Sequence, residues 1–283
     1  MAADMIGLVG VGKMGSALLV QLKAAGHKVR AFDIFAGAMD AAEKAGAEKA
    51  ASPADAARDC AFVHVFLATD QQVIDVMTAA DGVFAGTKPG TIVLLHSTIL
   101  PATTQRVAEL APHGVRVIDA PCTSIPKVLE AGGGMFLVGG PKDTVETARV
   151  HLKPLSKDIY HFGPLGAGNA AKIAKNLGNV VERVMVAETA RLVEAAGLDI
   201  TQFLAMTKAA GHGGVWAHWE RVLVVENGHA SPKRAAGLVS KDIHHAMTLA
   251  KNFGLELPVT HATAETAGRW HAAWKAGGTA KVN

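Results

Sequence analysis

Residues 10–15 read GVGKMG, and this glycine pattern stands between an apolar run and a helix-like segment. Residues 5–9 predict a short buried strand, and residues 13–25 predict a helix that stops at Gly26. A strand, a glycine-rich turn and a helix in this order are typical of the start of a βαβ unit. The chain has 30 glycines, so such a pattern also arises by chance and its surroundings decide its meaning.

Strand-like apolar runs alternate with helix-like segments through the first half of the chain. Further strands are predicted at residues 28–33, 61–67, 91–95 and 115–119. Ser52 opens the sequence Ser-Pro-Ala-Asp, which predicts a capped helix start with proline in the first turn. This alternation favours a parallel sheet that is covered by helices on both faces.

The pattern changes near residue 163, after which the sequence predicts helices only. The first helix runs from 167 to about 196 without a proline, and shorter helices are predicted at roughly 201–209, 214–226, 233–253 and 258–275. The chain is therefore expected to be an α/β protein with an N-terminal Rossmann domain and an all-helical C-terminal domain. The expected bounds are residues 1–163 and 164–283.

Composition excludes several classes of protein. Hydrophobic residues make up 49% of the chain, which is too many for a disordered protein, and the formal net charge of +3 does not favour nucleic acid as a partner. There is no run of about 18 apolar residues, and the start of the chain lacks the basic region of a signal peptide. Cys60 and Cys122 are far apart and suggest neither a disulfide framework nor a metal pair, which favours the cytoplasm.

The glycine pattern is interpreted as a dinucleotide-binding loop. Gly10 permits a tight turn, Gly12 lets the backbone approach a pyrophosphate, and Gly15 lets the helix pack closely on the strand. The pyrophosphate would lie on N–H groups at the helix N-terminus. The alternative is a tight turn that binds no ligand. The remaining residues of the expected loop are Val11, Lys13 and Met14.

Asp33 ends the second predicted strand, about 20 residues after the glycine pattern. A carboxylate at this place accepts hydrogen bonds from the adenosine ribose and repels a 2′-phosphate, and no arginine follows that would bind one. The sequence therefore predicts NAD, and not NADP, as the cofactor. The alternative is that Asp33 only caps the following turn.

Five motifs in this order resemble the β-hydroxyacid dehydrogenase family, which includes 3-hydroxyisobutyrate dehydrogenase and tartronate semialdehyde reductase. The resemblance covers nearly the whole chain. It rests on the opening segment 6–33, HSTILP at 96–101, DAP at 119–121 with VGG at 138–140, GAGNAAKIAKN at 166–176, and KD at 241–242. It implies hydride transfer between a nicotinamide cofactor and the hydroxyl-bearing carbon of a small hydroxy acid. It also implies an active site in the cleft between the domains, and a homodimer or homotetramer.

The resemblance makes Lys172 the general acid and base, and Asn176, one helical turn later, its partner in orienting the substrate. An ordinary lysine has a pKa near ~10.4, so a base at neutral pH requires burial or nearby positive charge. The neighbours of Lys172 are apolar, which is consistent with burial. Without the resemblance, a lysine on a helix surface is the ordinary interpretation.

Two further residues are expected near the cofactor on the same resemblance. Thr98, beside Ser97, would lie near the nicotinamide ring, and its alternative role is that of a helix cap. Lys241 would reach the cofactor while Asp242 braces the helical domain, and the alternative for this pair is a surface ion pair.

The chain departs from the family pattern after the DAP segment. Many members have Ser-Gly-Gly there, whereas this chain has Thr123-Ser124-Ile125. Thr123 keeps a hydroxyl and, with Ser124, is expected to bind substrate. Ile125 is β-branched, does not suit a positive φ, and adds an apolar wall. We therefore expect a substrate that is bulkier or less polar than 3-hydroxyisobutyrate.

The sequence also bears on three other functions. An imine-reductase-like enzyme of the same fold usually lacks the catalytic lysine, and a nucleotide-binding sensor would not need Lys172, Asn176 and Thr98 together. A metal enzyme is not expected, because the C-terminal histidines lack a ligand spacing such as HExxH. These histidines include His212, His218, His244 and His245, and Trp216 nearby is a further candidate for substrate contact.

Overall fold

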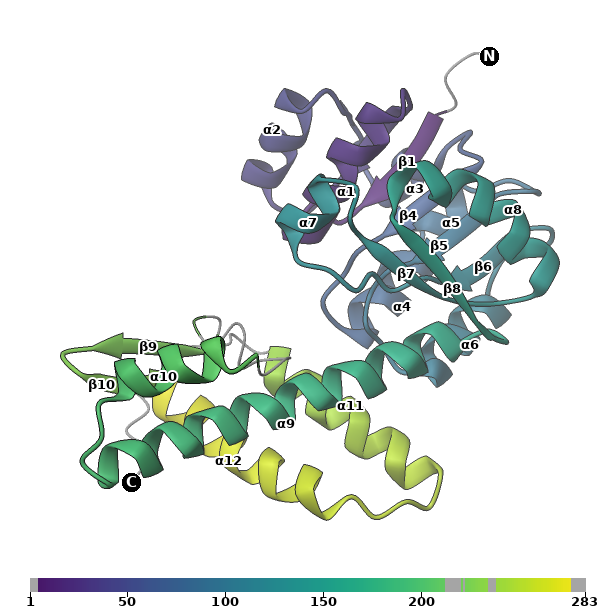
Figure 1. Ribbon diagram of the computed structural model, residues 1–283. Helices are drawn as coiled ribbons and strands as arrows, with labels where there is room; N and C mark the ends of the chain where they lie inside the picture. The colour runs from purple at the N-terminus through teal and green to yellow at the C-terminus, as the bar shows by residue number, and fades with distance from the viewer. Residues whose placement is uncertain (1–4, 212–219, 221, 234–237, 276–283) are drawn as a thin grey trace. The chain divides into compact units, whose positions relative to one another are not determined.

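The structure is a computed structural model of the 283-residue chain, and it describes residues 5–211, 220, 222–233 and 238–275. The chain forms two compact units, which divide between Lys172 and Ile173. Each unit is described by itself. Helix α9 (Ala167–Ala195) begins in the first unit and continues in the second (Figure 1).

The first unit is built on an eight-stranded sheet with the order β3-β2-β1-β4-β5-β6-β7-β8. Its first six positions follow the strand order of a dinucleotide-binding fold, with the chain reversing direction across the sheet between β1 and β4. All neighbours pair in parallel except β6 and β7, which are antiparallel. The predicted α/β fold is thus confirmed. The strands are β1 (Met5–Val9), β2 (Lys28–Phe32), β3 (Glu48–Lys49), β4 (Phe62–Val65), β5 (Ile92–Leu95), β6 (Arg116–Asp119), β7 (Met135–Gly139) and β8 (Asp158–Gly163).

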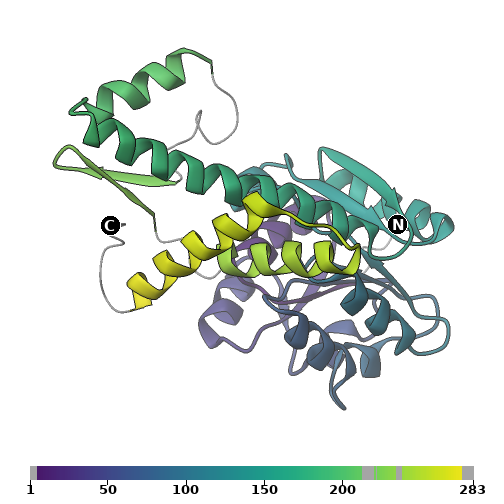
Figure 2. The ribbon, with the colours of Figure 1, turned by 90° about the horizontal axis from the view of Figure 1, so that it is seen from below.

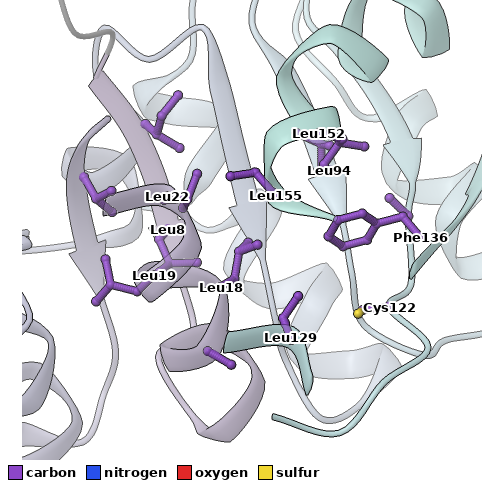
Figure 3. Close-up of a cluster of buried hydrophobic side chains, with 14 of the residues drawn as sticks. Leu8, Leu18, Leu19, Leu22, Leu94, Cys122, Leu129, Phe136, Leu152 and Leu155 are labelled. Atoms are coloured by element: carbon purple, nitrogen blue, oxygen red, sulfur yellow. The ribbon is translucent and has the colours of Figure 1, made fainter. Parts of the chain in front are cut away.

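Helices cover both faces of this sheet. Along β5, Leu94 packs into one buried cluster and Leu95 into the other, because successive side chains of a strand point to opposite faces. Figure 3 shows the first cluster, to which α1 contributes Leu18, Leu19 and Leu22. The helices are α1 (Lys13–Ala24), α2 (Ala36–Lys44), α3 (Pro53–Ala57), α4 (Asp70–Thr78), α5 (Val83–Gly86), α6 (Pro101–Glu109), α7 (Pro126–Glu130) and α8 (Lys142–Leu152), which the short η1 (Lys153–Leu155) follows.

Local sequence signals in this unit give the elements that they predict. Strand β1 has the predicted bounds, and the other predicted strands end within two residues of those observed. The helix start at Ser52 is confirmed, because its Oγ accepts a hydrogen bond from the N–H of Asp55 at 3.1 Å and Pro53 is the first helical residue.

The second unit is mainly helical. Its buried cluster contains Val184 and Ala190 of α9, Leu204 of α10 and Trp270 of α12. Helices α11 and α12 lie next to each other, joined by a short turn (Figure 2). The elements after α9 are α10 (Ile200–Ala209), β9 (Leu223–Glu226), β10 (His229–Pro232), α11 (Leu238–Asn252) and α12 (Pro258–Lys275).

The predicted helix at 214–226 is wrong at its C-terminal end, and the second unit is not helical throughout. Residues 223–232 form an antiparallel hairpin of β9 and β10. Its turn is Asn227-Gly228 with φ of 53° and 77°, and Asn-Gly is the strongest short-range signal for a two-residue hairpin. That signal was available in the sequence. The rest of the predicted helix, with His212, Trp216 and His218, lies outside the described residues.

The boundary predicted at residues 163 and 164 coincides with the end of β8, whereas the compact units divide later, inside α9. The difference arises because the first turns of α9 are hydrogen-bonded to the end of β6, as described below. Within the part of the chain that the structure describes, no helix has the length and apolar character needed to span a membrane.

Candidate active site

The glycine loop between β1 and α1 has the backbone that the pattern predicts. Gly10 has φ of 88°, and a side chain there would clash with the carbonyl oxygen of Phe66. A side chain at Gly15 would clash with the carbonyl oxygen of Gly10, so α1 can approach β1 this closely only with glycine at that position. The tight turn and the close helix–strand contact therefore both depend on glycine.

The N-terminus of α1 is open to an external anion. Its first residues are preceded by Gly12, which has no side chain to cap the helix, and its first turn contains no acidic residue. A Cβ at Gly12 would have no described atom within 4 Å. Lys13 is exposed, and Met14 packs partly on the buried cluster below. An uncapped helix start with open space before it favours a phosphate group as its partner.

Asp33 links the end of β2 to this loop. Its Oδ2 accepts a hydrogen bond from the N–H of Val11 at 2.7 Å, and its Oδ1 accepts one from the N–H of Phe35 at 3.0 Å. The carboxylate therefore does cap the turn that follows it. Each carboxylate oxygen can accept a second hydrogen bond, so this does not exclude a role at a ribose.

Thr98 follows β5, and residues before and after it make hydrogen bonds to other segments. The Oγ of Ser97 accepts a hydrogen bond from the N–H of Leu67 at 2.7 Å. Leu100, and not Thr98, is the capping residue of α6, and its N–H donates to Oδ1 of Asp70 at 2.9 Å. The alternative role of Thr98 as a helix cap is therefore wrong, although Pro101 begins α6 as predicted.

Lys172 lies in the second turn of α9 and is half-buried. Its Nζ donates a hydrogen bond to the carbonyl oxygen of Cys122 at 2.8 Å. Cys122 follows β6, so the amino group of Lys172 is placed beside the segment 121–125. Burial raises the pKa of the Cys122 thiol, which also lies 3.3 Å from the Oγ of Ser124.

The segment after β6 contains no residue with a positive φ between 123 and 125, where Thr123, Ser124 and Ile125 are all described. The N–H of Thr123 donates to the carbonyl oxygen of Met135 on β7 at 2.8 Å, so this N–H serves the sheet. The side chain of Ile125 is 44% exposed.

Asp119 and Asn169 form a buried network that the sequence did not identify as functional. The two carboxylate oxygens of Asp119 accept hydrogen bonds from the N–H groups of Gly166 at 2.7 Å and Asn169 at 2.6 Å. Burial raises the pKa of Asp119, and these N–H groups oppose that shift. The DAP motif contains Asp119, but its partners are 47 and 50 residues away, which no local pattern indicates.

The second unit holds the other candidates. The Nδ2 of Asn176 donates a hydrogen bond to Oδ2 of Asp242 at 3.0 Å, so α11 orients this amide. Lys241 precedes Asp242 on α11 and is half-buried. Asn176 stands one helical turn after Lys172 along α9.

In the first unit, the candidate residues follow the carboxyl ends of parallel strands. Gly10 follows β1, Asp33 follows β2, Thr98 follows β5 and Thr123 follows β6. The carboxyl ends of parallel strands meet at one edge of a sheet, which is where open α/β sheets bind ligands. Among the described residues, no three His, Cys, Asp or Glu side chains are placed to hold a metal ion.

Comparisons with known proteins agree with this arrangement. A family model described as the NAD-binding domain of 6-phosphogluconate dehydrogenase matches residues 5–163. A second, described as NAD-binding of NADP-dependent 3-hydroxyisobutyrate dehydrogenase, matches residues 166–281.

Individual relatives match over most of their length. An NAD-dependent L-serine dehydrogenase of Pseudomonas aeruginosa is 32% identical, over 92% of this chain and 87% of that protein. A probable mitochondrial 3-hydroxyisobutyrate dehydrogenase of Dictyostelium discoideum is 30% identical, over 88% and 80%. The solved structure of Mycobacterium tuberculosis 3-hydroxyisobutyrate dehydrogenase with L-serine has a TM-score of 0.82 at 28% identity, over 95% and 94%. An imine reductase from Myxococcus stipitatus is similar at 20% identity, which shows a shared fold only.

Proposed function

The chain belongs to the β-hydroxyacid dehydrogenase family of NAD(P)-dependent oxidoreductases, and we propose that it oxidises a small 3-hydroxy acid reversibly, with Lys172 as general acid and base. The observation that carries this proposal is the position of Lys172 Nζ, 2.8 Å from the carbonyl oxygen of Cys122 and beside the segment expected to bind substrate. A single ionisable group at this place suffices to move the hydroxyl proton.

The protein's own residues have separable tasks in this reaction. Bound NAD supplies the acceptor for the hydride. The start of α1 would hold the pyrophosphate, and the carboxylate of Asp33 would hold the adenosine ribose. Thr98 and Lys241 are the other residues expected to contact the cofactor. Lys172 takes the hydroxyl proton during oxidation and returns it during reduction. Asn176, held by Asp242, orients the oxygen that carries this proton.

The decisive test is an NADH absorbance assay with a panel of hydroxy acids, followed by Lys172→Ala. The panel contains L-serine, 3-hydroxyisobutyrate and 3-hydroxy acids with larger 2-alkyl groups. Lys172→Ala is expected to lose roughly 10²–10⁴ in kcat if the lysine is the acid and base. A wild-type rate for this variant would remove Lys172 from the mechanism. Imines in the same panel test the alternative reaction.

The substrate is expected to carry a bulkier or less polar group than 3-hydroxyisobutyrate. The support is the side chain of Ile125, which is partly exposed beside Thr123 and Ser124, where many family members have glycine. The highest kcat/KM in the panel should therefore belong to a 2-alkyl derivative. If 3-hydroxyisobutyrate itself gives the highest value, this part of the proposal is overturned.

Two copies of the chain are expected to associate through the second unit. Helices α9 and α12 line a groove of about 420 Å³, and Leu192 and Val259 at this groove are 71% and 65% exposed. Exposed apolar side chains around a groove favour a protein partner, and a symmetric dimer lets the same face serve both copies. Leu192→Asp with Val259→Asp should reduce the mass measured by light scattering. Val150→Asp, on α8, changes an apolar residue that is 78% exposed and is the control.

The cytoplasm is the expected location. The support is the state of the two cysteines, Cys60 and Cys122, which are both buried and free.

A further inference from the structure

We propose that Asp119 is a positioning residue for the reaction, which fixes the start of α9 so that Lys172 reaches the end of β6. The inference rests on the proposed role of Lys172. It assigns to Asp119 a task beyond framing the substrate segment, because its carboxylate contacts the helix that carries the lysine.

The carboxylate of Asp119 is completely buried at the end of β6. One oxygen accepts from the N–H of Gly166, which precedes α9, and the other accepts from the N–H of Asn169 in its first turn, so a single side chain holds two backbone groups at the helix start. These N–H groups have no partner inside the helix, and an anion at this end also interacts favourably with the helix dipole. The carboxylate thus fixes both the position and the rotation of the helix start.

Two glycines make this contact possible. A side chain at Gly139 would clash with Oδ1 of Asp119. At Gly168, a Cβ would lie 2.9 Å from Oδ2 of Asp119 and would clash with the carbonyl oxygen of Leu137. The start of α9 therefore lies in close contact with the carboxyl ends of β6 and β7, and the helix cannot shift there without a clash. The position of the Asp119 carboxylate thus sets the position of the helix start.

Asn169 provides a second anchor from the helix side. Its side chain is fully buried, its Oδ1 accepts from the N–H of Ile99 at 3.2 Å, and its Nδ2 donates to Oγ1 of Thr104 at 3.2 Å. Ile99 follows Thr98, so the same helix turn is tied to the segment expected near the nicotinamide ring. Asp119 and Asn169 together link the ends of β5 and β6 to α9.

Because α9 is a regular helix, fixing its start also fixes the position of Lys172. Lys172 follows Asn169 by three residues and lies on a neighbouring part of the helix surface. Its acceptor Cys122 follows Asp119 by three residues. Because each residue along a helix adds 1.5 Å and about 100°, a small slip of the helix start moves Nζ away from the carbonyl of Cys122. A misplacement of about 1 Å is enough to cost about 10²-fold in rate.

The test compares Asp119→Asn with the wild-type enzyme. The asparagine keeps the shape but offers one accepting oxygen in place of two. We expect kcat for the best panel substrate to fall about 10²-fold, with the Kd for NADH changed less than about twofold. Asp199→Asn is the control, because Asp199 also binds two N–H groups at a helix start, those of Thr201 and Gln202, but accepts both through Oδ1, which an asparagine retains. It should leave kcat unchanged.

A double variant separates positioning from general loss of structure. If Asp119 acts through Lys172, adding Asp119→Asn to Lys172→Ala lowers kcat no further, whereas an independent structural effect would lower it again. NMR of methyl-labelled lysines reports the surroundings of Lys172 without turnover, and Lys172→Arg identifies its signal. The chemical shift of this signal should change in Asp119→Asn and stay unchanged in Asp199→Asn. If Asp119→Asn does not fold, Asn169→Ala and Gly168→Ala disturb the same helix start with the carboxylate in place.

The possible failures are distinguishable. A wild-type kcat in Lys172→Ala contradicts the proposed function. A large loss in Lys172→Ala together with wild-type kcat and an unchanged Lys172 signal in Asp119→Asn contradicts the positioning role alone. The positioning role is also contradicted if the loss of kcat in the double variant equals the losses of Asp119→Asn and Lys172→Ala combined.

Discussion

The carboxylate of Asp33 accepts a hydrogen bond from the backbone N–H of Val11 across 2.7 Å. The residue expected to recognise the ribose is therefore part of the glycine loop itself. Its charge and its hydrogen bond to the loop are separate contributions, and substitutions can remove one without the other.

Asp33→Asn tests the charge. The amide oxygen can still accept from the N–H of Val11, so the contact to the glycine loop is kept, although the hydrogen bond from the N–H of Phe35 is lost. The repulsion of a 2′-phosphate disappears. We expect the ratio of kcat/KM for NADP to that for NAD to rise at least about tenfold, equivalent to about 1.4 kcal/mol. Asp33→Ala, which removes both contributions, should weaken both cofactors. A wild-type enzyme that already prefers NADPH would contradict the assignment of NAD.

Gly12 and Gly15 allow stability and cofactor binding to be separated. A Cβ at Gly15 would clash with the carbonyl oxygen of Gly10, so Gly15→Ala should lower the free energy of unfolding by about 1–3 kcal/mol. A Cβ at Gly12 enters open space, so Gly12→Ala should fold normally and yet bind NADH more weakly. Chemical denaturation and NADH fluorescence measure the two effects. Equal NADH affinity in Gly12→Ala and the wild type would argue against a pyrophosphate at this helix start.

Most of the first unit could be predicted because its signals are local. The strand at Met5–Val9, the cap at Ser52 and the proline that begins α6 each depend on a few neighbouring residues. Strands β3, β7 and β8 were not predicted. Strands β3 and β8 lie at the two edges of the sheet and their side chains are half-buried or exposed. Strand β7 is an apolar and mostly buried run, so its local signal was missed. The hairpin turn at Asn227 and Gly228 was missed although its signal was local.

The contacts of the candidate site depend on the tertiary fold and could be predicted only in part. The family motifs indicate Lys172 and Asn176, but no pattern indicates that Lys172 contacts the carbonyl of Cys122 or that Asn176 contacts Asp242. Those partners are 50 and 66 residues away, and only the packing of the strands and helices brings them together.

Ile125 offers a direct test of substrate range. Its backbone has φ of −92°, which every residue type can adopt, so a glycine introduces no strain and removes the apolar side chain. Ile125→Gly should shift the preference toward smaller substrates: kcat/KM should rise for 3-hydroxyisobutyrate and fall for its larger 2-alkyl relatives. The exposed Val128 on α7 supplies the control, Val128→Ala, which should leave the ratio unchanged. An unchanged ratio in Ile125→Gly would exclude this side chain from the substrate site.

Three buried histidines form a hydrogen-bonded chain through the core of the first unit. His64 Nδ1 lies 2.7 Å from His96 Nε2, and His64 Nε2 lies 2.8 Å from His151 Nε2. His96 Nδ1 lies 2.6 Å from the carbonyl oxygen of Ala120, which can only accept. His96 therefore donates to Ala120, His64 donates to His96, and His151 donates to His64, with all three rings neutral.

These three histidines make the free energy of unfolding depend on pH below neutrality. Burial lowers the pKa of His96 to about 4 and of His151 to about 3, and it lowers that of His64 well below its ordinary value. Above pH ~6.5 both the folded and unfolded chains hold neutral rings, so the histidines add no pH dependence. Below it the unfolded chain binds protons that the folded chain does not, so the free energy of unfolding falls as pH falls toward about 4. The maximum slope is about 1.4 kcal/mol per pH unit for each histidine.

Urea denaturation at a series of pH values between 7 and 4 measures this slope, and variants assign it. His64→Leu removes the central ring and with it the hydrogen bonds to His96 Nε2 and His151 Nε2, so we expect a loss of about 1–3 kcal/mol at pH 7. Because one buried neutral histidine is then missing, the fall in stability with acidification should also be shallower than in the wild type. His113→Asn, at an exposed position, is the control and should reproduce the wild-type curve. If the free energy of unfolding of His64→Leu falls with acidification in parallel with that of the wild type, the three buried histidines do not set the acid sensitivity.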